Sequence, residues 1–131
     1  MGKAANSSIS LKQIHVTDNF WNKYVHLVKD VIIPYQWDIL NDKLEDVETS
    51  HCIENFKIAA GEKEGEFQGA VFQDTDVAKW LEAVGFVLNY ERDEKLEELA
   101  DETIELIGRA QQPDGYLSLI HISEPTRLRC I

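Results

Sequence analysis

The part of the chain that most constrains the architecture is residues 74–112, DTDVAKWLEAVGFVLNYERDEKLEELADETIELIGRAQQ. Apolar side chains, with one threonine among them, recur there at helical spacing in two runs, separated by a short polar segment at 89–93. The first run is Val77, Trp80, Leu81, Val84 and Leu88, and the second is Leu96, Leu99, Ala100, Thr103, Ile107 and Ala110. Each run falls on one face of a helix. The two runs with their short connection predict an αα-hairpin.

Two polar loops are expected to lie together at one end of this hairpin. Because its helices are antiparallel, the second helix ends on the side where the first begins. The loop at 61–74 and the turn at 112–116, which contains Pro-Asp-Gly, are therefore expected at the same end. Both are rich in polar and aromatic residues. Helical toroids present carbohydrate pockets in this way, and any hairpin also arranges its surface loops in this way, so the pattern leaves both interpretations open.

The residues before the hairpin predict further short elements. Residues 9–16, ISLKQIHV, predict a short β-strand, although Ile14 breaks the strict alternation. Thr17-Asp18 predicts the start of a helix. Pro34 is expected to kink or break that helix at the preceding residue and to begin a second helical stretch. Residues 53–60 predict a short helix that ends at Gly61, and Asp74-Thr75 predicts a capped start for the next helix.

Composition limits the partners and the compartment. The chain has 131 residues and a net charge of −11, which argues against nucleic acid and anionic membranes as partners. No apolar run approaches the length of a membrane span, and the first ten residues lack the apolar core of a signal peptide. These features predict a cytoplasmic protein. Residues 1–8 are expected to be a disordered N-terminus.

Four ordered blocks of sequence resemble one enzyme family. They are FWNKYVHLVKDVIIPYQWDILND at 20–42, NFKIAAGE at 55–62, GEFQGAVFQDTDVAKWLEAVGFVL at 65–88 and LIGRAQQPDGYL at 106–117. In this order and spacing they look like the N-terminal region of the family 127 glycoside hydrolases, the β-L-arabinofuranosidase-like enzymes. The resemblance covers roughly residues 10–117. It implies a mainly α fold, an incomplete (α/α)6 barrel of helical hairpins preceded by a short N-terminal β-strand, with residues 9–117 as the N-terminal part of the catalytic domain.

The resemblance also implies a chemistry that this piece lacks. In the family, a cysteine nucleophile at a zinc site of Cys and Glu ligands performs retaining hydrolysis, with a glutamate as acid/base. Those residues follow the DGYL turn, and Cys52 matches none of them, so we expect it to be a small buried thiol. We expect no catalytic residue, metal ligand or cofactor in this fragment, and we expect the fragment alone to be inactive. Zinc and hydrolysis of terminal β-L-arabinofuranosyl residues of plant-derived glycans are implied only for the full-length parent.

Five residues at the loop end of the hairpin are candidates for binding an arabinose-containing oligosaccharide. Phe72 and Tyr116 could stack on the C–H faces of a sugar ring. Gln73 could hydrogen-bond to hydroxyl groups or cap the backbone. Asp74 and Asp114 could contact sugar, or could serve only as a helix-start residue and a turn former, respectively. The alternative function is a non-catalytic helical-hairpin interaction module, although DTDVAKW and QQPDGY each occur once, which argues against a repeat protein.

The last residues differ in character from the rest of the chain. Residues 118–131, SLIHISEPTRLRCI, show neither helical periodicity nor clean alternation. A common transposase-type sequencing adapter, translated in one frame, gives LSLIHISEPTR, which matches residues 117–127 without a mismatch. We therefore predict that residues 118–131 are a non-native tail. The alternative is a natural apolar strand followed by a proline turn.

Overall fold

The computed structural model describes residues 9–119, and these residues form a small assembly of helices. Along the chain the elements are η1 (Leu11–Gln13), α1 (Asn19–Leu27), η2 (Val28–Ile32), α2 (Ile33–Leu40), α3 (Cys52–Ala59), α4 (Asp74–Tyr90) and α5 (Glu94–Ala110). No β-strand occurs between residues 9 and 119. The predicted disorder of residues 1–8 and most of the predicted tail lie outside the described residues.

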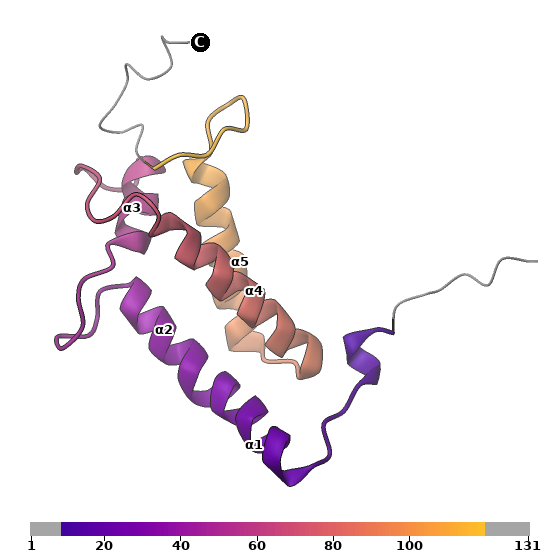
Figure 1. Ribbon diagram of the computed structural model, residues 1–131. Coiled ribbons are helices and arrows are strands. Elements are labelled where there is room, and N and C mark those ends of the chain that lie inside the picture. The colour runs from indigo at the N-terminus through magenta and orange to yellow at the C-terminus, as the bar shows by residue number, and fades with distance from the viewer. Residues whose placement is uncertain (1–8, 120–131) are drawn as a thin grey trace, which may run out of the picture.

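The predicted hairpin is confirmed by α4 and α5, which run antiparallel (Figure 1). Asp93 caps α5 by accepting a hydrogen bond from the backbone N–H of Leu96 at 3.2 Å. The buried residues are Val77, Trp80, Val84 and Val87 on α4, and Ala100, Thr103, Leu106 and Ala110 on α5. The helical period therefore identifies six of these eight buried residues, while Val87 and Leu106 were not predicted. The remaining predicted face residues, Leu81, Leu88, Leu96, Leu99 and Ile107, are half-buried.

The helix that begins after Asp18 is longer than expected. Asp18 accepts hydrogen bonds from the N–H groups of Phe20 and Trp21 at 3.0 and 2.8 Å, which confirms the predicted cap. The break at Ile33 does not occur, because Ile33 keeps right-handed helical angles and α2 continues from η2. Instead η2 is a π-helical turn that ends two residues before Pro34. A wider turn accommodates a proline that lacks an N–H and crowds the preceding carbonyl groups.

The prediction of a strand over residues 9–16 is wrong. Leu11–Gln13 form a 3₁₀ helix, and the Ser10 hydroxyl accepts a weak hydrogen bond from the Lys12 N–H at 3.4 Å. A strand needs a neighbouring strand for its backbone hydrogen bonds, and residues 9–119 offer none. The alternation of Ile9 and Leu11 therefore has no sheet to which it could contribute.

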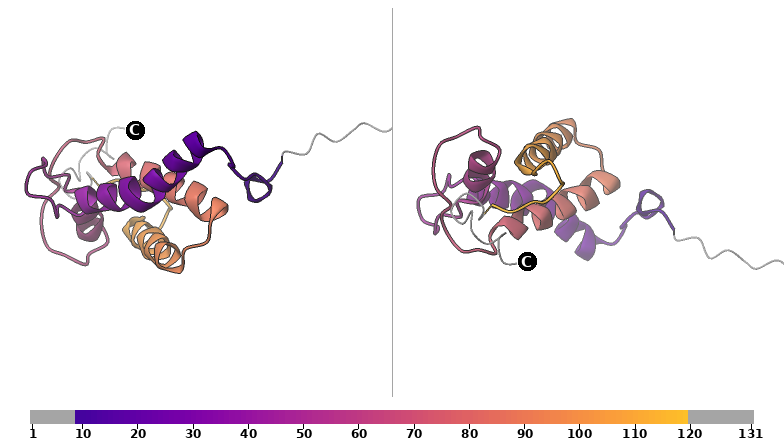
Figure 2. Two further views of the ribbon diagram at one scale, coloured as in Figure 1. Left: turned by 90° about the horizontal axis from the view of Figure 1, so that it is seen from below. Right: turned by 90° about the horizontal axis from the view of Figure 1, so that it is seen from above.

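The core lies where α2, α3 and α5 meet α4. Figure 2 shows α4 between α5 on one side and the α1–α2 path on the other. Trp80 joins α4 to α2. Its indole Nε1 donates to the Ile33 carbonyl at 3.1 Å, and its ring centroid lies 4.5 Å from that of Trp37. Leu119 is also part of the core at 1% exposure, although it lies within residues 118–131, the predicted non-native tail.

Candidate functional site

The loop at 61–73 is held against α3 by one buried side chain. The carboxamide of Asn55 donates to the Gln68 carbonyl at 2.8 Å and accepts from the Gln68 N–H at 3.0 Å. Gly61, with φ of +74°, ends α3 as predicted: its N–H donates to the Ile58 carbonyl, and the next N–H donates to the Lys57 carbonyl. This loop and the turn after α5 lie at the same end of the hairpin (Figure 1), as predicted from antiparallel geometry.

The three predicted site residues before α4 differ in their availability. Phe72 is 67% exposed, so its ring is open to a partner. Gln73 is engaged twice within the protein: its side-chain Oε1 accepts from the Ala70 N–H, and its carbonyl accepts from the Cys52 thiol, both at 2.8 Å. Asp74 is half-buried and is the first residue of α4. The predicted capping by Asp74-Thr75 is wrong, because α4 begins without a side-chain cap and Thr75 bonds back to the Phe72 carbonyl.

The two predicted site residues after α5 belong to one tight turn. Asp114 accepts a hydrogen bond from the Tyr116 N–H at 3.0 Å, which is the role of a turn former. Gly115, with φ of +84°, donates to the Gln112 carbonyl, and the Gln112 N–H donates to the Tyr116 carbonyl, each at 2.8 Å. The Tyr116 side chain is 51% exposed. The turn therefore presents an aromatic ring at the loop end of the hairpin.

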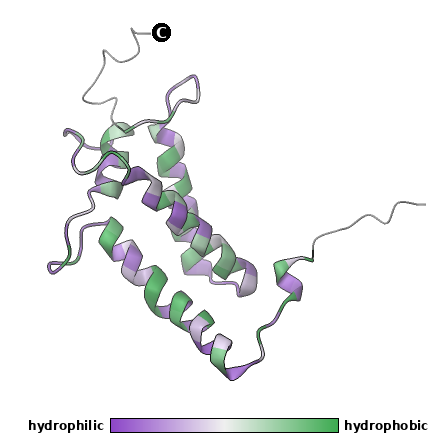
Figure 3. Ribbon diagram, in the orientation of Figure 1, coloured by the Kyte–Doolittle hydropathy of each residue, from purple (hydrophilic) through white to green (hydrophobic). Residues whose placement is uncertain are grey.

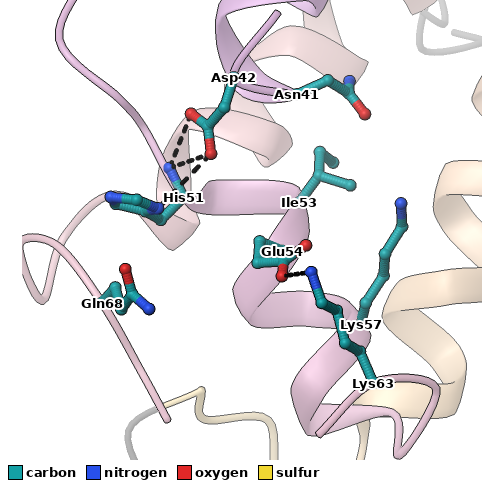
Figure 4. A pocket seen from close by; sticks show the side chains of 8 residues that line it. All are labelled: Asn41, Asp42, His51, Ile53, Glu54, Lys57, Lys63 and Gln68. Carbon is teal, nitrogen blue, oxygen red and sulfur yellow. Dashed lines mark hydrogen bonds and ion pairs between the residues drawn. The ribbon is translucent and has the colours of Figure 1, made fainter. Parts of the chain in front are cut away.

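A polar cavity of about 250 Å³ lies beside α3 and is lined by none of the five predicted residues (Figure 4). Its lining comes from the end of α2, the start of α3 and the loop at 61–73: Asn41, Asp42, His51, Ile53, Glu54, Lys57, Lys63 and Gln68. Sequence reasoning missed this cavity because residues 41–51 show no helical period. The predicted loop contributes Lys63 and Gln68 to it.

Asp42 organises the segment between α2 and α3. Its carboxylate accepts from the Ser50 N–H at 2.6 Å and from the His51 N–H at 3.0 and 3.1 Å. The Nδ1 atom of His51 lies 3.5 Å from Oδ2 of the same carboxylate. Asp42 and His51 both have left-handed backbone angles, with φ of +55° and +54°. Such strain in non-glycine residues persists where surrounding contacts hold it, and these hydrogen bonds supply the contacts.

The charges around the cavity favour binding over acid/base chemistry. Glu54 forms an ion pair with Lys63, and Asp42 is used by backbone N–H groups, so both carboxylates are already engaged. Acid/base hydrolysis of a glycosidic bond needs two carboxyl groups that face the substrate. The ammonium of Lys57 and the carboxamide of Gln68 line the same space and offer hydrogen-bond donors. The cavity can therefore hold a hydroxyl-rich or anionic group.

Cys52 behaves as a structural thiol. It is fully buried, and its Sγ donates to the Gln73 carbonyl at 2.8 Å. Desolvation raises the pKa of the thiol to about 12, opposed by a hydrogen bond from the Val77 backbone. Within residues 9–119, no cluster of three or more His, Cys, Asp or Glu side chains could hold a metal ion. These residues therefore do not fit a zinc site of the kind the family resemblance implies.

The same residues contain no helix long and apolar enough to cross a membrane.

Similarity to known proteins now assigns the family. A sequence model of the β-L-arabinofuranosidase GH127 catalytic domain matches residues 13–129. The chain belongs to the GH127 family. A non-reducing end β-L-arabinofuranosidase of Bifidobacterium longum subsp. longum is 41% identical over 116 residues, which cover 79% of this chain and 18% of the relative.

Two solved GH127 structures match the fold. A β-L-arabinofuranosidase from Geobacillus stearothermophilus T6 has a TM-score of 0.83 and 56% identity, covering 88% of this chain and 18% of its own. Another GH127 β-arabinofuranosidase has a TM-score of 0.74 and 30% identity, covering 87% and 17%. The helices of this chain thus form part of the helical-hairpin barrel of GH127. The chain spans less than a fifth of the length of the relatives it matches.

Proposed function

We propose that this chain is a fragment of a glycoside hydrolase that releases terminal β-L-arabinofuranosyl residues from plant-derived glycans. The observation that carries the proposal is the 41% identity to a protein described as a non-reducing end β-L-arabinofuranosidase, together with the matching GH127 catalytic domain. The parent would act on an arabinose-containing oligosaccharide in the cytoplasm. The alternative, a helical-hairpin interaction module, has no comparable support.

In this proposal the loop at 61–73 and the turn after α5 line one side of the substrate pocket, and the fragment supplies no catalytic group. Phe72 and Tyr116 are the strongest of the five candidate residues, because their exposed rings can stack on a sugar. Gln73 and Asp114 already accept hydrogen bonds within the protein, so they would act mainly by shaping their loops. Asp74 would reach the substrate only from the first turn of α4. Zinc, if the parent uses it, would be bound by residues outside 9–119.

The test uses the complete reading frame from the source DNA. We expect the complete protein to hydrolyse p-nitrophenyl β-L-arabinofuranoside, and we expect the 131-residue chain to show no turnover. Chelation and re-addition of zinc to the complete protein tests the metal separately. A complete protein that is inert on β-L-arabinofuranosides but active on another glycoside would refute the substrate, and a frame that encodes only further hairpins would favour the interaction module.

We also propose that residues 118–131 are foreign to the parent protein. The match of 117–127 to a translated adapter supports this. The burial of Leu119 and the match of the family model through residue 129 favour the alternative of a natural segment. The nucleotide sequence distinguishes a foreign tail from a natural segment. A codon series across Ser118 to Arg127 that differs from the adapter would exclude a foreign tail.

A further inference from the structure

Lys57 on α3 is a half-buried lysine without an ion-pair partner. In the part of the chain that the structure describes, Lys29 and Lys57 are the lysines that are not fully exposed. Lys29 lines an apolar groove of about 530 Å³ between α1 and α4, bordered by Trp21 and Phe86, and its ammonium lies 2.9 Å from the Glu91 carboxylate. Lys57 forms no ion pair with any described carboxylate. A charge held partly out of water is stabilised by an opposite charge, so the environment of Lys57 favours an anion.

Lys57 lines two cavities, and their charges decide between them. The second cavity lies between α3 and α5 and encloses about 330 Å³. Its charged lining residues are Lys57, Glu62, Glu102, Glu105 and Arg109. Three carboxylates face two cations there, so this space repels an anion. The polar cavity of Figure 4 holds two carboxylates and two ammonium groups, and the Lys57 ammonium points away from the Glu54–Lys63 ion pair. The polar cavity is therefore the side from which Lys57 can bind an anion.

Two further groups that line the polar cavity suit hydroxyl groups. The backbone of Gln68 is held by Asn55, whereas its side-chain carboxamide makes no hydrogen bond to a described residue. The Nδ1 atom of His51 lies 3.5 Å from the Asp42 carboxylate, which leaves Nε2 for another partner. Both side chains can therefore bind hydroxyl groups beside the anion that Lys57 attracts.

Size and charge narrow the class of ligand. The cavity volume of about 250 Å³ lies just below the range of roughly 300–1,000 Å³ that is usual for ligand pockets, so it fits one small group. One unpaired ammonium matches the single charge of a carboxylate better than the near double charge of a phosphate. A single carboxylate beside several hydroxyl groups is the chemistry of a sugar acid.

The wall of the cavity is already formed within this chain. Asp42 accepts hydrogen bonds from the backbone N–H groups of Ser50 and His51, which fixes the connection between α2 and α3. Figure 3 shows this connection as mostly hydrophilic. A wall that is fixed before binding loses little conformational freedom when a ligand enters. The loop at 61–73 also carries Phe72, so the cavity borders the same loop as the candidate arabinose contact.

We propose that the polar cavity beside α3 binds the carboxylate of a uronic acid residue in the arabinose-containing glycan, with Lys57 as its ion-pair partner. The carboxamide of Gln68 and the imidazole of His51 bind the hydroxyl groups of the same residue. The assignment to a glycan rests on the proposed function, because a glycan substrate is what brings a sugar acid to this loop.

The test is a titration of the ¹⁵N-labelled 131-residue chain followed by NMR, which detects weak binding. The probes are methyl β-D-glucuronide, its neutral counterpart methyl β-D-glucoside, and acetate. We expect the glucuronide to shift the amide signals of residues 51–57 and 68, and to bind at least tenfold more tightly than either other probe. Acetate that binds as tightly as the glucuronide would overturn the assignment to a sugar acid. The absence of a saturable shift with the glucuronide would overturn the site.

Variants identify the cation. Lys57→Gln should weaken glucuronide binding at least tenfold, whereas Lys57→Arg, which keeps the charge, should restore it to within about threefold of the unchanged chain. Lys95→Gln is the matched control, because Lys95 is an exposed and unpaired lysine on α5. Equal binding by Lys57→Gln and the unchanged chain would overturn the proposal.

Salt dependence gives a readout that needs no variant to fold. Raising the salt concentration from about 20 to about 200 mM should weaken binding of the glucuronide and leave that of the glucoside unchanged, and the absence of this difference would overturn the ion pair. Binding does not depend on activity, so the two proposals fail separately. A complete protein that hydrolyses β-L-arabinofuranosides, with a chain that ignores the glucuronide, refutes this site alone. Glucuronide binding, with a complete protein inert on β-L-arabinofuranosides, refutes the assignment to an arabinose-containing glycan and leaves a sugar-acid site.

Discussion

Trp80 should contribute more to stability than any surface aromatic residue of the same helix. It is almost fully buried, it donates a hydrogen bond to the Ile33 carbonyl at 3.1 Å, and it packs against Trp37 at 4.5 Å. It thereby fixes α2 on α4 across 47 residues of sequence. Trp80→Phe removes the indole N–H and part of the ring, whereas Trp80→Ala removes the whole contact.

The magnitudes follow from these contacts. Loss of the hydrogen bond costs about 1 kcal/mol, and the smaller contact that a phenyl ring makes with Trp37 costs about 1 kcal/mol more. We therefore expect Trp80→Phe to lower the free energy of unfolding by about 2 kcal/mol, and Trp80→Ala by about 3–5 kcal/mol. In a domain of this size 2 kcal/mol corresponds to a melting temperature about 10 °C lower.

The assay is thermal unfolding followed by circular dichroism at 222 nm, at low micromolar protein so that the apolar groove does not promote association. Phe86→Ala is the matched control, because Phe86 lies on the same helix and is mostly exposed. It should cost less than about 1 kcal/mol in the isolated chain. The reasoning fails if Trp80→Phe melts within 2 °C of the unchanged chain, or if Phe86→Ala destabilises as strongly as Trp80→Ala.

Three further predictions concern the loop end. Asn55→Ala should lower the free energy of unfolding by about 1–2 kcal/mol. It should also speed tryptic cleavage within residues 61–73, because it frees both backbone groups of Gln68. An unchanged cleavage rate would mean that Asn55 does not hold this loop. Asp42→Ala should destabilise the chain by about 1 kcal/mol more than Asp42→Gly, measured by urea unfolding, because only glycine adopts φ of +55° without strain; equal losses would mean that the backbone angle costs nothing. The pKa of Cys52, raised to about 12, means that the folded state holds the thiol proton more tightly than the unfolded state. Its contribution to stability should be complete below about pH 9 and should be lost as the pH rises toward 12. Comparing the pH dependence of unfolding with that of Cys52→Ala checks this, and an identical dependence would contradict it.

Where the signal is local, the sequence predicted the structure well. The 3.6-residue period located the buried faces of α4 and α5, and Asp18 and Gly61 were identified as helix ends because capping involves only neighbouring residues. The strand at 9–16 was mispredicted for the opposite reason. Its alternating residues satisfy a local rule, but a strand forms only when another strand is available to pair with it.

In the candidate site, too, local features were predicted from the sequence and contacts between distant residues were not. Antiparallel geometry was enough to place the loop at 61–74 and the turn at 112–116 at one end of the hairpin. The turn role of Asp114 was among the predicted alternatives. The sequence left open a backbone-capping role for Gln73, and its side chain accepts a hydrogen bond from the Ala70 N–H. The contact of its carbonyl with Cys52 was outside sequence reasoning, because Cys52 lies 21 residues away and the contact depends on how α3 meets α4.

By itself, the sequence determined the helical hairpins, the acidic character of the chain and the resemblance to the GH127 family, because each is encoded in residue identity and spacing along the chain. Only the tertiary structure decided which apolar faces are covered. It buried Trp80 and Trp37 against each other, left Trp21 and Phe86 facing an open groove, and drew Asp42 and His51 into a polar cavity. The physical reason is that burial depends on the neighbours a helix meets in space. A helical period shows that a face is apolar and does not show what covers it.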